Sequence, residues 1–203
     1  MSTTPSDPNR WEERYARDDI PWDIGAPDPY LQAFVNDYAV RQGAVLEIGC
    51  GTGTNAVWMA QQGLQVYATD VSQTAVARAA ATVEAAGVEC VVKQLDFLHD
   101  ALPDRRFNVI YDRAVFHVFP TIDERQRFVR RASQVLAPDG LWHSLLGSTD
   151  GPDRDVGPPR RSAAEITAAV EPYFEILKLN AVAFDQGGFR EVRAWSFVGR
   201  RRA

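Results

Sequence analysis

Three glycines alternate with other residues at Gly49, Gly51 and Gly53, directly after a short apolar run over residues 45–48. Glycine has no Cβ, so such a turn can take left-handed backbone angles and lets a ligand approach the main chain closely. Apolar residues with helical spacing follow the turn, and the first N–H groups of a helix lack partners within it. Strand, glycine turn and helix together predict a cradle for a small polar molecule.

Two carboxylates close later apolar runs of the chain. Asp70 ends the run over residues 65–69, and Asp96 follows the run over residues 89–94. Ligands of open α/β sheets bind beyond the carboxyl ends of the strands, so we expect both acids beside the glycine turn. Asp70 stands about twenty residues past the first glycine, where an acid can accept hydrogen bonds from both hydroxyls of a ribose. Ordinary helix capping is the alternative for both acids.

The spacing of the glycines indicates whether the turn would bind a dinucleotide or a single nucleoside. A dinucleotide fingerprint has its third glycine five residues after the first, and this chain has Thr54 there. Asp96 offers an acceptor for an adenine amino group, and Phe97 offers an apolar flank for the ring. We therefore expect a single nucleoside with a polar tail. An NAD-dependent or non-catalytic nucleotide-binding protein is the alternative from another class.

Composition narrows the class of protein. The 203 residues are 45% hydrophobic and 24% charged, which is typical of one globular domain over residues 1–203. The net charge of −5 argues against nucleic acid as a partner, because phosphate binding needs a basic surface. Two cysteines, Cys50 and Cys90, make neither a disulfide framework nor a metal site. With no signal peptide and no membrane-spanning run, we expect a cytoplasmic protein.

Strand and helix patterns alternate along the chain. Strands are expected over residues 45–48, 65–69, 89–94, 107–111, 141–146, 174–179 and 192–198. Helices are expected over residues 30–38, after Asn55, between Ser72 and Gly87, and after the capping-box residues Thr121 and Ser162. This alternation indicates a parallel sheet with helices on both faces. No helix separates the last two strands, so we expect a hairpin with one antiparallel strand at or near an edge.

The N-terminal region divides into two parts. Residues 1–9 are polar and are expected to be disordered. Residues 10–38 carry Trp11, Tyr15 and Trp22, which fit no strand pattern. These aromatics either close the edge of the core or form a lid over the glycine turn, and the residues alone leave both open.

As a set, Glu47-x-Gly49-x-Gly51-x-Gly53 with Asp70 and Asp96 resembles the class I S-adenosylmethionine-dependent methyltransferases. The resemblance implies a Rossmann-like, doubly wound, seven-stranded α/β sheet, mostly parallel with its last strand antiparallel. It implies that Asp70 binds the ribose, that Asp96 and Phe97 bind the adenine, and that the glycine turn, oriented by Glu47, binds the methionine part. The expected cofactor-binding set is completed by Cys50, Asn55 and Val71.

The N-terminal residues resemble one branch of that class. The segments 11–15 (Trp-Glu-Glu-Arg-Tyr) and 21–27 (Pro-Trp-Asp-Ile-Gly-Ala-Pro) are similar to the opening of the thiopurine, thiol and halide methyltransferases. This resemblance implies that Trp11, Tyr15 and Trp22 form a lid over the cofactor, although Tyr15 departs from the tryptophan of the plant members. It also implies that Arg113, a tyrosine in some relatives, lines the cofactor site. Residues 157–159 (Gly-Pro-Pro) match a loop of that group.

The resemblance implies methyl transfer to a small molecule, with a thiol or another soft nucleophile (selenium, tellurium or halide) as acceptor. A thiol is partly ionised at neutral pH and needs little help from a base. His117, shortly after the strand over residues 107–111, is the candidate base, and packing under the following helix is its alternative. An O- or N-methyltransferase of a small metabolite is the competing hypothesis. No metal cluster is evident, and the oligomeric state is open.

Overall fold

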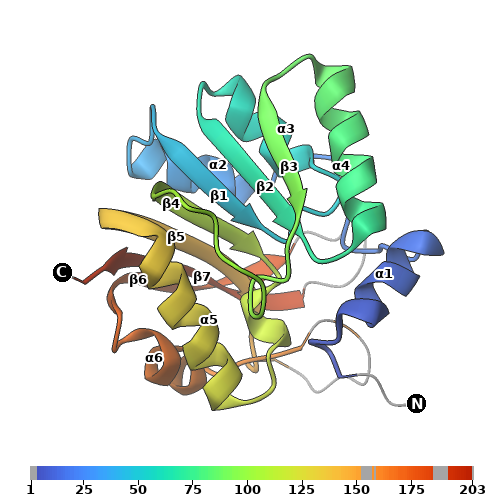
Figure 1. The fold of residues 1–203 in the computed structure, drawn as a ribbon. Helices are drawn as coiled ribbons and strands as arrows, with labels where there is room; N and C mark the ends of the chain where they lie inside the picture. The colour runs from blue at the N-terminus through green and yellow to red at the C-terminus, as the bar shows by residue number, and fades with distance from the viewer. Residues whose placement is uncertain (1–3, 152–156, 158, 185–191, 203) are drawn as a thin grey trace.

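A computed structural model describes residues 4–151, 157, 159–184 and 192–202. Its centre is one seven-stranded sheet in the order β3-β2-β1-β4-β5-β7-β6 (Figure 1). The strands are β1 (Ala44–Ile48), β2 (Gln65–Asp70), β3 (Cys90–Gln94), β4 (Phe107–Arg113), β5 (Leu136–Gly147), β6 (Phe174–Phe184) and β7 (Val192–Arg201). The seven strands expected from the sequence are all present, and the doubly wound α/β class is confirmed.

The first five strands in the chain pair in parallel, and β7 runs antiparallel between β5 and β6. The antiparallel last strand is therefore confirmed, and β6 forms the edge beside it. β6 is longer than expected because its pairing with β7 continues to Phe184 and Val192. All five residues of β1 are buried, as helices on both faces require.

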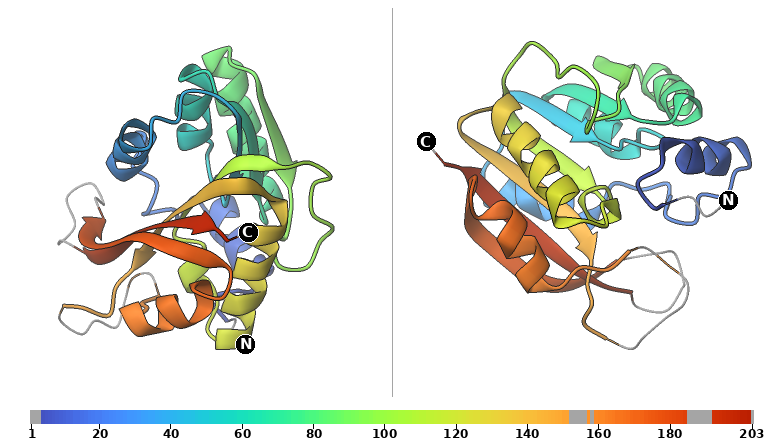
Figure 2. Two further views of the ribbon diagram at one scale, coloured as in Figure 1. Left: turned by 90° about the vertical axis from the view of Figure 1, so that its left-hand side faces the viewer. Right: turned by 60° about the horizontal axis from the view of Figure 1, so that its bottom comes forward.

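Two sets of helices cover the sheet (Figure 2). On one face lie α2 (Pro29–Asp37), α3 (Thr54–Gln61) and α4 (Gln73–Ala86), whose buried side chains pack with Val45, Val66 and Val109. On the other face lie α5 (Ile122–Val135) and α6 (Ala163–Val170), which pack with Leu46, Ile110 and Trp142. Both predicted capping boxes, at Thr121 and Ser162, are formed.

One expectation about local structure was wrong. Pro8 and Asn9 are helical, because α1 (Pro8–Ala16) begins there with Asp7 as its N-cap. Strand β5 begins earlier than expected and contains an irregularity. Leu136 pairs with Phe107 and pairing resumes at Leu141 with Val109, so extra residues bulge from β5.

Candidate functional site

A cavity of about 440 Å³ opens at the carboxyl ends of the parallel strands. Its volume lies within the range that small-molecule sites occupy. Most of the predicted site residues line it, namely Trp11, Tyr15, Trp22, Gly49, Cys50, Gly51, Asn55, Asp70, Val71, Asp96, Phe97, Arg113 and His117. Two predicted residues, Glu47 and Gly53, do not line it. The expected meeting of strand-end acids and glycine turn is therefore present.

The glycine turn has the backbone angles that its residue types predict. Gly49, Gly51 and Gly53 all have positive φ, between 57° and 87°, where other residues are strained. Gly53 caps α3, and an added Cβ there would meet the Ala79 backbone at 3.0 Å. Gly53 thus serves helix packing rather than ligand contact. The N–H groups of Gly49 and Cys50 both donate to the Thr69 carbonyl, which fixes the turn on β2.

Asp70 is buried beside the turn. One carboxylate oxygen accepts from the Gly51 N–H at 3.0 Å, and the other accepts from the Ser72 N–H at 3.0 Å. Burial raises the pKa of this carboxyl to about 6, against the opposing effect of those hydrogen bonds. The side chain therefore joins the glycine turn to the start of α4 and faces the cavity as a hydrogen-bond acceptor.

Glu47 lies within the sheet beneath the turn, and its Oε2 has no hydrogen-bond partner in the described structure. Burial, and then the Asp70 charge, raise the pKa of the Glu47 carboxyl to about 8, and a hydrogen bond with Asn55 opposes the rise. Asn55 in turn accepts from the Asp28 N–H at 2.9 Å. Glu47 therefore contacts the first turn of α3 from within the sheet, and the orienting role that the resemblance implied stays a prediction.

Asp96 lines the cavity, but its carboxylate is engaged within its own turn. It accepts from the Leu98 N–H at 2.9 Å and the His99 N–H at 3.2 Å, and it contacts the His99 ring. Asp96 therefore stabilises its own turn and caps no helix, because no helix begins between β3 and β4 in the described structure. Phe97 and Leu98 supply an apolar wall next to it. Arg131 of α5 donates to the Phe97 carbonyl at 2.6 Å and so fixes this wall from behind.

The three N-terminal aromatics form one cluster at the cavity. The rings of Trp11 and Trp22 meet edge to face at 5.4 Å, and the Trp22 indole N–H donates to the Tyr15 hydroxyl at 3.3 Å. An added Cβ on Gly51 would lie 2.9 Å from that hydroxyl, so Tyr15 rests on the glycine turn. The placement favours the lid interpretation. Of residues 10–38, which were expected to form the lid, only those before α2 line the cavity, because α2 packs on the sheet.

Glu12 and Arg78 anchor this lid, and sequence reasoning missed both. Glu12 of α1 accepts from the Ser72 hydroxyl at 2.6 Å and the Thr74 N–H at 3.1 Å, at the first turn of α4. Arg78 of α4 donates to the Tyr15 carbonyl at 2.9 Å. Figure 1 shows α1 beside α4, although the two helices are far apart in the sequence. No short-range signal in the sequence points to these partners.

Arg113 holds the chain that follows the lid helix. Its Nε donates to Asp28 at 2.7 Å, and its Nη1 donates to the Trp22 carbonyl at 3.2 Å. Asp28 also caps α2 through the N–H groups of Tyr30 and Leu31. The aspartate before a proline was a signal for that cap, but the buried ion pair with Arg113 depends on the fold. Arg113 therefore lines the cavity while tying the lid segment to β4.

His117 lies in the 3₁₀ turn η1 (Phe116–Val118) and is buried at the cavity wall. Its Nδ1 accepts from the Gly147 N–H at 2.7 Å. A nitrogen that accepts a hydrogen bond carries no proton, so the neutral ring has its proton on Nε2. Asp112 shapes this turn by accepting from the N–H groups of Val115 and Phe116.

This sheet order, with a glycine turn after β1 and acids after β2 and β3, defines the class of S-adenosylmethionine-dependent methyltransferases. The sequence profile of Thiopurine S-methyltransferase (TPMT) matches residues 6–194. The chain belongs to this family, and its cofactor is S-adenosylmethionine. The alternative of an NAD-dependent protein is thereby set aside. Among the described residues, no helix has the length and apolar character needed to cross a membrane.

Individual relatives differ in their acceptors. A probable thiol methyltransferase 2 of Arabidopsis thaliana is 31% identical over 154 residues, which are 73% of this chain and 65% of that protein. A 2-heptyl-1-hydroxyquinolin-4(1H)-one methyltransferase of Mycobacteroides abscessus is 28% identical over 83% of this chain and 77% of its own. The Burkholderia thailandensis 1,6-didemethyltoxoflavin-N1-methyltransferase superposes with a TM-score of 0.80 at 18% identity, over 100% of this chain and 92% of that one, which shows the shared fold.

Proposed function

We propose that this methyltransferase transfers the methyl group to a small thiol or another soft nucleophile. The cofactor contacts are part of the proposal. Asp70 accepts hydrogen bonds from the ribose, Phe97 and Leu98 flank the adenine with Asp96 at its edge, and the glycine turn holds the methionine part. The left-handed glycines, which let a ligand approach the main chain closely, suit such a nucleoside-bearing ligand.

The cofactor supplies a methyl group on a positively charged sulfur. The residues of this chain supply alignment and a water-poor surrounding. Trp11, Tyr15 and Trp22 cover the glycine turn, and exclusion of water favours a reaction in which charge is dispersed. Holding acceptor and methyl in line is the main contribution expected of the protein.

One observation supports the choice of a soft acceptor. The side chains that could act as a base near His117 and Arg113 already have a hydrogen-bond or ion-pair partner. His117 Nδ1 already accepts from the Gly147 N–H, and the Asp28 carboxylate pairs with Arg113 at 2.7 Å. With Nδ1 occupied in this way, neutral His117 cannot take a proton at that nitrogen, which suits a thiolate better than an alcohol that must be deprotonated. A thiol has a pKa of about 8.5 and supplies its own anion near neutral pH.

A methyl-transfer assay over matched acceptors tests this proposal. Small thiols, phenols, amines and iodide are incubated with the protein and S-adenosylmethionine at pH 7.5, and formation of S-adenosylhomocysteine is followed. We expect turnover of thiols, and of iodide more slowly, with phenols and amines near background. Turnover of phenols or amines without thiols or iodide would contradict the proposal and support the O- or N-methyltransferase hypothesis.

A further inference from the structure

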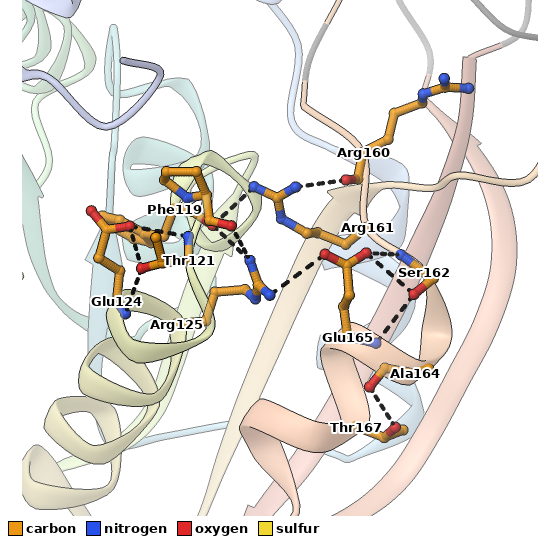
Figure 3. A network of polar contacts seen from close by, with 11 residues as sticks. Phe119, Thr121, Glu124, Arg125, Arg160, Arg161, Ser162, Ala164, Glu165 and Thr167 are labelled. Carbon is orange, nitrogen blue, oxygen red and sulfur yellow. Dashed lines mark hydrogen bonds and ion pairs between the residues drawn. The ribbon is translucent and has the colours of Figure 1, made fainter.

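The segment from His117 to Pro120 forms a wall of the cavity but has little regular structure of its own. The Phe119 carbonyl there accepts from two guanidinium groups, Arg125 Nη1 at 3.0 Å and Arg161 Nη2 at 2.9 Å (Figure 3). Arg125 Nη1 also donates to the Pro120 carbonyl at 2.9 Å. Two arginines from different elements therefore fix the main chain that carries Phe119 and His117.

Arg161 also holds the adjoining part of the cavity wall. It ends the connection from β5 to α6, and Gly157 and Pro159 of this connection line the cavity. The Arg161 N–H donates to the Gly147 carbonyl at 2.8 Å, and its carbonyl accepts from the Trp195 indole at 3.0 Å. One residue thus joins the η1 wall, the end of β5 and the connection that lies beside them.

Glu165 of α6 provides the negative charge for this cluster. Its Oε1 lies 3.5 Å from Arg125 Nη2, while its Oε2 accepts from the Ser162 N–H at 2.9 Å in the capping box. Burial opposes ionisation, yet the Ser162 hydrogen bonds and the charges of Arg161 and Arg125 hold the pKa of Glu165 below its ordinary value. Arg125 is buried and Arg161 is half-buried, and two like charges on one carbonyl repel each other. The Glu165 carboxylate offsets this repulsion.

We propose that Glu165, acting through Arg125 and Arg161, is a positioning residue for the methyl acceptor. It fixes the segment of Phe119 and His117 against the adjoining segment of Gly157 and Pro159, both of which line the cavity. This inference rests on the proposed function and adds to it that the acceptor binds beside these two segments. The residues proposed to hold the cofactor lie at the ends of β1, β2 and β3, and Glu165 touches none of them in the described structure.

The test compares two glutamates with the same local role. Glu165→Gln and Glu124→Gln each alter the third residue of a capping box, and glutamine can still complete that box. Of these two glutamates, only Glu165 lies within ion-pair distance of an arginine in the described structure, while the charge of Glu124 acts more weakly on Arg161. We expect Glu165→Gln to raise KM for the acceptor by about five- to tenfold, with the affinity for S-adenosylhomocysteine unchanged within about twofold. Glu124→Gln should alter neither quantity.

Hydrogen exchange gives a readout independent of turnover. With S-adenosylhomocysteine bound, Glu165→Gln should speed amide exchange in residues 116–121 and 159–162 and leave residues 49–55 unchanged. Arg161→Lys, which keeps the charge but loses the planar fork, should give the same pattern. The inference is overturned if amide exchange and acceptor KM stay unchanged in Glu165→Gln. It is also overturned if Glu124→Gln changes both quantities to the same extent as Glu165→Gln. Failure of the unaltered protein to methylate thiols would instead count against the proposed function.

Discussion

The buried Asp70 carboxylate links two elements and has a raised pKa. Its two oxygens tie the glycine turn to α4, and its burial keeps the pKa near 6. Asp96, the other strand-end acid, has its oxygens occupied by its own turn. Both carboxylates thus accept main-chain hydrogen bonds, Asp70 from two elements and Asp96 from its own turn.

The raised pKa of Asp70 predicts a pH dependence of cofactor binding. Ribose hydroxyls donate to the ionised carboxylate, so binding favours the charged form and should weaken as the pH falls through about 6. Calorimetric titration with S-adenosylhomocysteine between pH 5 and pH 8 measures this. We expect Asp70→Asn to bind more weakly, by roughly 1.5–3 kcal/mol at pH 8 for loss of charge-assisted hydrogen bonds. The variant should also lose most of the pH dependence; an equally steep profile would remove Asp70 from the site.

His117 gives a second prediction at this scale. His117→Phe leaves the buried Gly147 N–H without its acceptor, which should lower the free energy of unfolding by about 1–3 kcal/mol. Because Nδ1 is already occupied, we expect the loss in thiol methylation to be equally large at pH 7 and pH 9. Urea unfolding and initial rates at the two pH values check these expectations. A deficit that disappears at pH 9, where the thiol ionises unaided, would restore His117 as a general base.

At the scale of elements, α1 is joined to α4 by polar contacts. Glu12 bonds to the first turn of α4, Arg78 bonds back to Tyr15, and Trp22 and Arg113 continue the connection to β4. Tyr15 is the one buried side chain of α1, whereas each of α2 through α6 buries at least two, so α1 should open before the sheet does.

Removal of the Glu12 carboxylate should therefore loosen α1 without unfolding the protein. We expect Glu12→Ala to speed hydrogen exchange in residues 8–16 and to weaken S-adenosylhomocysteine binding about fivefold, because a smaller fraction of the protein has the lid in place. Glu13→Ala is the matched control, since Glu13 pairs only with the exposed Arg17 in the described structure. Equal effects of the two substitutions would show that the contact with α4 is immaterial.

At the scale of the whole molecule, the buried carboxyl groups at the site make the free energy of unfolding fall as the pH rises. The pKa of Glu47, about 8 in the folded chain, exceeds its ordinary value of 4.5 because of burial, and the folded state therefore holds a proton that the unfolded chain loses. Its contribution to stability is complete below pH 4.5 and is lost as the pH rises through 8. The carboxyls of Asp70 and Asp112, each with a pKa raised to about 6, act in the same direction at lower pH.

The ligand-free protein should accordingly become less stable, by a few kcal/mol, as the pH rises from about 5 to about 8. Glu47→Gln removes the largest of these titrations and should flatten that slope while keeping a neutral, hydrogen-bonding side chain beside Asn55. Chemical unfolding at several pH values, without cofactor, measures the slope. A Glu47→Gln slope as steep as that of the unaltered chain would show that Glu47 is ionised throughout.

Local patterns in the sequence determined much of this protein. Apolar runs located all seven strands, the glycines at 49, 51 and 53 predicted left-handed backbone, and two capping boxes marked helix starts correctly. These features depend on neighbours within a few residues, where φ, ψ preferences and main-chain hydrogen bonds act. The last two strands likewise had to form a hairpin, because no helix separates them.

Only the tertiary structure decided which distant residues meet. The pairs Glu12 with Ser72, Asp28 with Arg113, and Arg161 with Phe119 join segments separated by tens of residues. Their contacts arise because the sheet brings the carboxyl ends of its strands to one edge, and no periodicity within a segment encodes that meeting. The same is true of the Asp96 carboxylate and the His117 tautomer, which depend on which donors the completed fold places against them.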